Sequence, residues 1–297
     1  MKFFYLAGGY GNRAQPLSFV KPKALFPLCG EPLLERIFRQ LIGNGLTGGF
    51  INLHYRHQDF LPVLSGYSKV RVIFEKELTG SRVISCAATS LGGKPLLVVN
   101  GDVYLDVPVS AMQDVYRKTG ADGVLLVRHH SGSAYQTLRC RQGRYLGLNS
   151  KNHRQGLMYT GVALMGPRLV KEIEEMNFFA TLERLKTDVR VLVYDGVWLD
   201  LGDPRSYFHA NQQFERQLKR DPTADVQNGA VKGVPVNFLS SGVTISSTSR
   251  VEESIVWEGV CIEGSSLIRR CIVTTGVRLV DSVYEDRIIT ERGIFDF

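Results

Sequence analysis

A short repeat near the C-terminus constrains the fold of this chain more than any other feature of its sequence. The tetrapeptide Gly242-Val243-Thr244-Ile245 has counterparts that begin at Gly259 and Gly276, each 17 residues further on. Aliphatic residues return every five or six positions within this frame, at Ile245, Val251, Val256, Ile262, Ile268, Val273 and Leu279. Such a rhythm is typical of a β-solenoid, in which one aliphatic residue of each short strand stacks on the coil below. We therefore predict a short β-solenoid, with ordinary antiparallel strands as the alternative.

Before the repeat, apolar runs alternate with amphipathic segments. The predicted strands are residues 2–7, 50–53, 70–74, 96–100 and 124–127, with later ones near 135–148, 157–165 and 189–194. Helical patterns occupy residues 33–42, 82–91 and 109–118, and a last helix begins at Pro204 after Asp203 as N-cap. This alternation predicts an α/β domain with a mixed, mostly parallel sheet.

The two patterns are separated by a segment without periodicity, residues 219–232. It reads as a linker because neither the helical nor the strand rhythm continues through it. We therefore predict a first domain over residues 1–220, a linker over 221–233 and the solenoid over 234–297.

Composition limits the class of protein. The chain has 297 residues, of which 44% are hydrophobic and 22% charged, the profile of a globular protein. No apolar run approaches the ~18 residues that cross a bilayer, and the run before Gly8-Gly9 is too short for a signal-peptide core. These features predict a cytoplasmic protein without a membrane partner. The 5 cysteines are odd in number and none are at CxxC spacing, which favours buried or half-buried free thiols.

The net charge of +7 indicates an anionic partner. The basic residues are scattered and do not form long runs, so a phosphorylated small molecule fits them better than nucleic acid does. No nucleic-acid partner is therefore expected.

A glycine-rich loop follows the first predicted strand, at Gly8-Gly9-Tyr10-Gly11-Asn12-Arg13. Backbone N–H groups in such a loop approach phosphate oxygens without obstruction by side chains. Gly9-x-Gly11-x-x-Ala14 also fits the dinucleotide fingerprint, but Pro16 stops the helix that this fingerprint requires. The P-loop pattern GxxxxGK[ST] is absent. A turn without a ligand remains the simple alternative.

The chain resembles the sugar-1-phosphate nucleotidylyltransferases. Their signature LAGGxGTRLxPLT corresponds to residues 6–18, and PKxLxPV corresponds to residues 22–28. The resemblance continues through Gly101-Asp102 and through residues 198–204, and many relatives carry a C-terminal left-handed β-helix. It implies a Rossmann-like nucleotidyltransferase domain followed by a short left-handed β-helix of hexapeptide type.

The resemblance also implies a reaction and its site. A sugar 1-phosphate attacks the α-phosphorus of a nucleoside triphosphate and pyrophosphate leaves, so positioning and charge neutralisation account for the rate. Arg13 and Lys23 would be the catalytic cations, and Asp102 and Asp200 would hold Mg²⁺, which prefers carboxylate oxygens. For either aspartate, a turn-forming hydrogen bond is the alternative.

The remaining site residues follow from matching motif positions. The nucleotide-binding set would be Leu6, Ala7, Gly8, Gly9, Gly11, Asn12 and Gly80. Lys151 and Gly161 would bind the sugar phosphate, although the glutamate that precedes the family's lysine is missing here and Lys151 reads equally as a surface residue.

Some positions depart from the family pattern. Asn12 replaces a threonine, Ala14 and Gln15 replace a leucine and a basic residue, and Arg82 lies where relatives place small residues around the nucleoside. These departures leave open a nucleotide-sugar-binding regulatory subunit without turnover. Mannose 1-phosphate with GTP is the first substrate guess, then glucose 1-phosphate with UTP or dTTP. A homo-oligomer assembled through the β-helix, with Trp257 as an aromatic anchor, is also expected.

Overall fold

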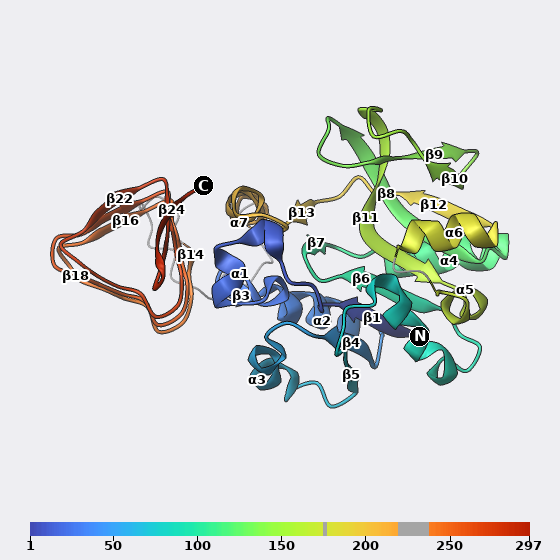
Figure 1. The fold of residues 1–297 in the computed structure, drawn as a ribbon, viewed down its shortest axis with the longest axis horizontal. Helices are drawn as coiled ribbons and strands as arrows, with labels where there is room; N and C mark the ends of the chain where they lie inside the picture. Colours follow the sequence, from blue (N-terminus) through green and yellow to red (C-terminus); the bar gives the residue numbers. More distant parts are fainter. Residues whose placement is uncertain (175–176, 219–237) are drawn as a thin grey trace. The chain divides into compact units, whose positions relative to one another are not determined.

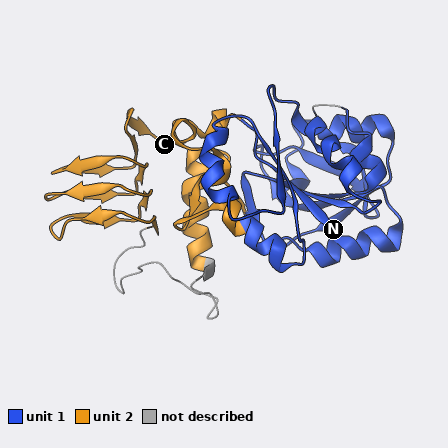
Figure 2. Ribbon diagram, turned by 90° about the horizontal axis from the view of Figure 1, so that it is seen from below, with its two compact units in different colours: residues 1–9, 37–198 blue, residues 10–36, 199–297 orange. Residues whose placement is uncertain are grey.

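The computed structural model describes residues 1–174, 177–218 and 238–297, which form two compact units. The first contains residues 1–9 and 37–198, and the second contains residues 10–36 and 199–297 (Figure 2). These boundaries differ from the predicted domains, because the segment after Gly9 and the last helix group with the β-helix. The predicted linker, residues 221–233, lies outside the described residues.

The first unit is built on a nine-stranded mixed sheet with the order β5-β4-β1-β6-β11-β8-β12-β10-β9. Its strands are β1 (Lys2–Leu6), β4 (Gly49–Leu53), β5 (Val70–Phe74), β6 (Leu96–Asn100), β8 (Gly123–Ser131), β9 (Thr137–Arg141), β10 (Arg144–Leu148), β11 (Gln155–Met165) and β12 (Val189–Val193). Strands β5, β4, β1 and β6 are parallel, as are β8 and β12. Strand β11 runs antiparallel to β6 and β8. The expected α/β fold with a mixed sheet is confirmed. The sheet is not mostly parallel, because β10 also pairs antiparallel with β12 and β9, and β9 with β11.

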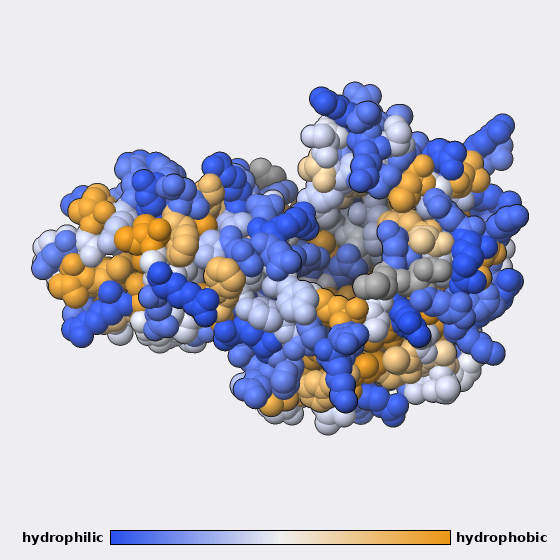
Figure 3. All heavy atoms as spheres, in the orientation of Figure 1, coloured by the Kyte–Doolittle hydropathy of each residue, from blue (hydrophilic) through white to orange (hydrophobic). Residues whose placement is uncertain are grey.

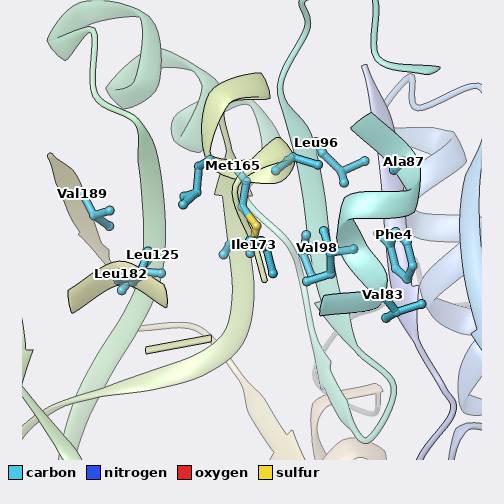
Figure 4. Close-up of a cluster of buried hydrophobic side chains, with 14 of the residues drawn as sticks. Phe4, Val83, Ala87, Leu96, Val98, Leu125, Met165, Ile173, Leu182 and Val189 are labelled. Carbon is cyan, nitrogen blue, oxygen red and sulfur yellow. The ribbon is translucent and has the colours of Figure 1, made fainter. Parts of the chain in front are cut away.

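Apolar side chains on the sheet and its helices explain why this unit is stable. Strand β4 is buried along its whole length, and β6 is buried except at Asn100. Figure 4 shows Phe4, Val98 and Leu125 of the sheet with Val83 and Leu182 from helical segments in one hydrophobic cluster. Removal of this apolar surface from water is the main driving force for folding.

Two helical segments of the first unit lie close to predicted helices, the 3₁₀ segment η4 (Gly80–Ser90) and α4 (Val109–Thr119). The sequence did not predict its other helices, which are η3 (His57–Phe60), α3 (Leu61–Leu64), α5 (Pro167–Lys171) and α6 (Phe178–Leu185). The short strand β7 (Val103–Leu105) follows β6. Helix α2 (Leu33–Gly43) contains the boundary between the units. The segment predicted as a helix near residues 82–91 is therefore helical, but of the tighter 3₁₀ type.

Before the β-helix, the second unit consists of short elements in residues 10–36 and one long helix after residue 199. The short elements are η1 (Asn12–Ala14), α1 (Leu17–Val20), η2 (Lys23–Leu25), β2 (Pro27–Leu28) and β3 (Glu31–Pro32). Helix α7 (Pro204–Leu218) begins as predicted, because Asp203 Oδ1 accepts a hydrogen bond from the Ser206 backbone N–H at 2.9 Å.

The rest of the second unit is the predicted β-helix, whose three-sided coils are visible in Figure 1. Its strands are β14 (Phe238–Leu239), β15 (Thr244–Ile245), β16 (Arg250–Glu252), β17 (Ile255–Val256), β18 (Cys261–Glu263), β19 (Leu267–Arg269), β20 (Ile272–Val273), β21 (Arg278–Val280), β22 (Val283–Glu285) and β23 (Arg287–Thr290). Parallel pairing places Ile245, Ile262 and Leu279 in one column. Strand β24 (Gly293–Asp296) pairs antiparallel with β23 and ends the parallel stacking.

Trp257 has a different role from the one predicted. Its side chain is fully buried and packs on Phe26 and Tyr207 of the same unit. It is therefore not a surface anchor for another subunit.

The cysteines are free thiols, as expected, although Cys86 is exposed. Among the described residues, no helix is long and apolar enough to span a membrane.

Candidate functional site

The first group of predicted site residues meets where the chain order of the sheet reverses. After β1 the chain adds β4 and β5 on one side and then returns to place β6 on the other. Leu6 and Asn100 are register partners at the carboxyl ends of β1 and β6. The Gly101 backbone N–H donates to Leu6 O at 2.8 Å. Open α/β sheets bind ligands at such a switch point.

Asp102 lies half-buried at this edge, directly after Gly101. Tyr5 donates its hydroxyl to Gly101 O at 3.3 Å, and burial together with the negative charge of Asp102 raises the pKa of Tyr5. Gly101 has no room for a side chain, since a Cβ would lie 2.4 Å from Leu6 O. The close approach of these two backbone segments therefore brings Asp102 to the start of the glycine-rich loop.

Two residues that sequence reasoning missed hold the first half of this loop. Asn52, at the end of β4, accepts a hydrogen bond from the Ala7 N–H at 2.9 Å and donates to Glu75 Oε2 at 2.5 Å. Glu75 also accepts bonds from the Thr79 N–H at 3.0 Å and the Thr79 hydroxyl at 2.6 Å. A Cβ on Gly8 would lie 2.6 Å from Asn52 Nδ2. This hydrogen-bond network joins the start of the glycine-rich loop to residues 75–79, which precede Gly80.

Asn52 carried one readable signal. It is a polar residue in an otherwise apolar strand, and a buried polar group requires partners. Glu75 carried no such signal, because nothing in its local pattern indicates that its carboxylate turns toward the glycine-rich loop after β1, residues 8–13 (the β1 loop).

Gly161 lies at an irregularity between β11 and β8, where the register shifts between Tyr159 and Ala163. Its φ is +92°, and a Cβ on Gly161 would lie 3.1 Å from Asn100 Cβ. Both the backbone conformation and the close contact favour glycine. The indole N–H of Trp198 donates to Thr160 O at 2.8 Å. Bulges of this kind are over-represented next to active sites. Gly161 thus adjoins the end of β6, and its role in sugar-phosphate binding stays a prediction.

The other candidates of the first unit lie at its surface. Lys151 is exposed in the turn after β10, and its role stays a prediction. Gly9 and Gly80 are also exposed, and Gly80 has a φ of +59°. Arg82, the departure from the family pattern, is exposed at the start of η4.

In the second unit, Gly11 and Lys23 lie side by side. Gly11 has a φ of +69° and precedes η1, whose Ala14 N–H donates to Gly11 O at 2.8 Å. A Cβ on Gly11 would lie 3.3 Å from Lys23 Cγ. The loop therefore needs glycine at this position both for its backbone conformation and to leave space for Lys23.

Arg13 and Asp200 also lie close together in the second unit. The Gly202 N–H donates to Asp200 Oδ1 at 2.7 Å. A Cβ on Gly202 would lie 2.9 Å from an Arg13 guanidinium nitrogen and 2.8 Å from Asp200 Oδ1. The glycine thus lets a cation and a carboxylate approach the same turn. Asn12 is exposed and directly precedes Arg13 in η1.

Carboxylate oxygens of the Asp102 and Asp200 type fit Mg²⁺ chemically. The two residues belong to different units, and their joint binding of one ion stays a prediction. Within the described ranges, no group of three or more His, Cys, Asp or Glu side chains is placed to hold a metal.

Two family models match the chain. Residues 4–135 match the nucleotidyl transferase family, and residues 225–284 match the GlmU-like C-terminal hexapeptide family. The first match contains the β1 loop, Lys23 and Asp102, and the second contains most of the β-helix.

Individual relatives are distant but extend over most of the chain. Mannose-1-phosphate guanylyltransferase 1 of Arabidopsis thaliana is 22% identical, over 88% of this chain and 82% of its own length. Mannose-1-phosphate guanyltransferase 2 of Candida glabrata is 22% identical, over 77% of this chain and 69% of its own. Among solved structures, HddC from Yersinia pseudotuberculosis complexed with GMP-PN superposes with a TM-score of 0.61 at 21% identity, covering 72% of this chain and 99% of that one.

Proposed function

We propose that this chain, with its nucleotidyl transferase domain and GlmU-like hexapeptide region, is an enzyme that transfers a nucleoside monophosphate from a nucleoside triphosphate to a sugar 1-phosphate. The products are a nucleoside-diphosphate sugar and pyrophosphate. The observation that carries this proposal is the meeting of the β1 loop and the Gly101-Asp102 turn at the switch point of the sheet.

The backbone of the loop, at Leu6, Ala7, Gly8, Gly9, Gly11 and Asn12, lines the nucleotide site, together with Gly80 after the Glu75–Thr79 contact. Its N–H groups approach phosphate oxygens because the glycines present no side chains. Lys23 and Arg13 neutralise the triphosphate and the charge that develops on the leaving pyrophosphate. Gly161 and Lys151 hold the sugar phosphate, so that its oxygen faces the α-phosphorus in line with the leaving group.

Enzymes of this class typically require a divalent cation, and we assign Mg²⁺ to Asp102 and Asp200. When bound, the ion supplies positive charge that polarises the α-phosphoryl group. The two aspartates supply hard oxygen ligands from two separate motifs.

Mannose 1-phosphate with GTP is the proposed substrate pair. The names of the Arabidopsis and Candida relatives support this choice. The regulatory-subunit alternative is not favoured, since the relatives are named as enzymes and Arg13, Lys23, Asp102 and Asp200 are all retained.

A pyrophosphate-release assay tests the proposal. The purified chain is offered GTP, UTP, dTTP, CTP or ATP, each with mannose 1-phosphate or glucose 1-phosphate, in the presence of Mg²⁺. We expect the fastest release with GTP and mannose 1-phosphate. Faster release with another pair would correct the substrate, and no release with any pair would refute the enzymatic proposal.

We further propose a cytoplasmic homo-oligomer that assembles through the β-helix. Support comes from exposed aliphatic side chains on the β-helix, where Val283 is 70% exposed and Val280 is 51% exposed. Figure 3 shows apolar residues gathered on the visible face of this part of the chain. Leu267 and Val283 are register partners on adjacent strands, so they form a two-residue apolar strip.

A further inference from the structure

A buried aromatic cluster in the second unit joins the β-helix to helix α7 and to the segment that follows Lys23. It consists of Trp257, Tyr207 and Phe26, each with no exposed surface. The ring of Phe26 lies 5.3 Å from that of Trp257 and 5.2 Å from that of Tyr207. The packing therefore joins three segments that are far apart in the sequence.

A chain of hydrogen bonds runs through this cluster. The Trp257 indole N–H donates to Tyr207 Oη at 3.1 Å, and the Tyr207 hydroxyl donates to Pro27 O at 2.7 Å. An indole N–H is a donor only, so the direction of the chain is fixed. Burial raises the pKa of Tyr207, which keeps its hydroxyl protonated as a donor. Through Tyr207 of α7, these hydrogen bonds thus link the β-helix to the backbone at Pro27.

The β-helix also holds the other side of the Lys23 segment. Lys21 forms an ion pair and hydrogen bond with Glu258, and its ammonium group lies 5.7 Å from the centroid of the Trp257 ring. Both contacts come from neighbouring residues of one coil. The segment is therefore fixed two residues before Lys23 and again three to four residues after it.

The segment has little structure of its own to hold Lys23. The residue begins η2, a 3₁₀ turn whose backbone bonds are Leu25 N–H to Pro22 O and Phe26 N–H to Lys23 O. Short 3₁₀ turns have poor hydrogen-bond geometry, and a displacement of about 1 Å in a positioning group lowers rates by about 10²-fold. The accuracy with which Lys23 is placed must then come from tertiary contacts.

We propose that Trp257 and Glu258 are positioning residues for Lys23, so that the C-terminal β-helix serves the reaction by fixing the phosphate-binding lysine. The inference rests on the proposed function for the role of Lys23. In this proposal the β-helix has a functional role within its own chain, independent of any role in subunit assembly.

Three variants test the proposal. Trp257→Phe retains an aromatic ring but removes the indole donor, Tyr207→Phe removes the link to Pro27, and Glu258→Gln removes the charge that pairs with Lys21. We expect each to raise the KM and the dissociation constant for the triphosphate by about tenfold, the usual effect of one buried hydrogen bond. The KM for the sugar 1-phosphate stays unchanged. Because Tyr207 mediates the effect of Trp257 on Pro27, the double variant Trp257→Phe/Tyr207→Phe should raise the KM for the triphosphate no more than Tyr207→Phe alone.

Ile268→Val is the matched control. Ile268 is a fully buried β-helix residue in the cluster that contains Val251 and Val273, and it belongs to neither the aromatic cluster nor the Lys23 segment. We expect it to lower the melting temperature without changing the KM for the triphosphate. If Trp257→Phe and Glu258→Gln behave like Ile268→Val, the β-helix has only a structural role and the proposal is wrong.

Amide hydrogen exchange keeps this test separate from the test of function. Trp257→Phe should speed exchange at Leu25 and Phe26, whose N–H groups close the η2 turn, whereas Ile268→Val should not. Unchanged exchange there would overturn the inference even in an active enzyme. Faster exchange in a chain without turnover would support the positioning while the proposed function fails.

Discussion

At the scale of single residues, the two aspartates make the most direct prediction. Asp102→Asn and Asp200→Asn should each abolish Mg²⁺-dependent pyrophosphate release, because an amide oxygen binds a hard cation more weakly than a carboxylate does. Both replacements keep the side-chain volume, so circular dichroism and melting temperature should stay near those of the unchanged protein. Asp114→Asn, at an exposed position of α4, is the control. Near-normal activity of either variant in Mg²⁺ would exclude that residue as a metal ligand.

The two predicted catalytic cations lead to a second prediction. Lys23→Ala and Arg13→Ala should each lower kcat/KM by roughly 10²–10³-fold, the usual loss when one preorganised charge-stabilising donor is removed. The loss should be the same for every triphosphate, since phosphates carry no information about the base. Lys118→Ala, at an exposed position of α4, should have no effect. A loss confined to one base would show that the residue reads the base instead.

Residue-scale predictions from the sequence were best where a role depends on a local motif. The glycine-rich loop and the Gly101-Asp102 turn could be placed together because parallel strands bring their carboxyl ends to one edge. Glu75 received no role and Trp257 was wrongly interpreted as a surface anchor, because their partners, Asn52 and Tyr207, are 23 and 50 residues away. No periodicity records which side chains meet across such separations.

At the scale of elements, the network around Glu75 predicts how the β1 loop is held. Glu75→Gln replaces one acceptor oxygen with an N–H₂ group, which faces the donors of Asn52 or Thr79. Loss of one charge-assisted bond should raise the KM for the triphosphate about tenfold. The KM for the sugar 1-phosphate should change little. Glu77→Gln, an exposed neighbour, is the control, and an equal rise in both KM values would contradict a role confined to the loop.

The ion pair between the Lys21 segment and the β-helix predicts a pH dependence of stability. Burial alone would raise the pKa of the Glu258 carboxyl, but the hydrogen bond and charge of Lys21 outweigh it and hold this pKa below its ordinary value of 4.5. A lowered folded-state pKa adds stability above pH 4.5 that is lost as the pH falls through the folded value. The melting temperature of the unchanged protein should exceed that of Glu258→Gln at pH 7, and the difference should shrink below pH 4.5. A difference that persisted at low pH would rule out the ion pair as its source.

At the scale of the whole molecule, hydrophobic periodicity predicted the helices and strands better than it predicted which of them belong to the same compact unit. The 17-residue rhythm anticipated the β-helix columns, because one buried side chain per strand repeats in sequence as it does in space. The predicted domain boundaries rested on the apparent linker, which lies outside the described residues, whereas residues 10–36 belong to the same compact unit as the β-helix. That grouping depends on side chains such as Phe26 that meet distant partners, and such contacts leave no mark in a local pattern.

The last prediction concerns assembly. The exposed strip of Leu267 and Val283 should be covered by a second copy of the chain, because burial of apolar surface favours association. Light scattering should give a homo-oligomer for the unchanged protein and a smaller species for the double variant Leu267→Glu/Val283→Glu. Thr244→Glu, an exposed change on a different sheet of the β-helix, should leave the size unchanged. Substitutions are preferable to removal of the β-helix, since truncation would expose Phe26 and Tyr207 and promote aggregation. An unchanged protein that is already a monomer, or a double variant that keeps its full size, would refute assembly through this strip.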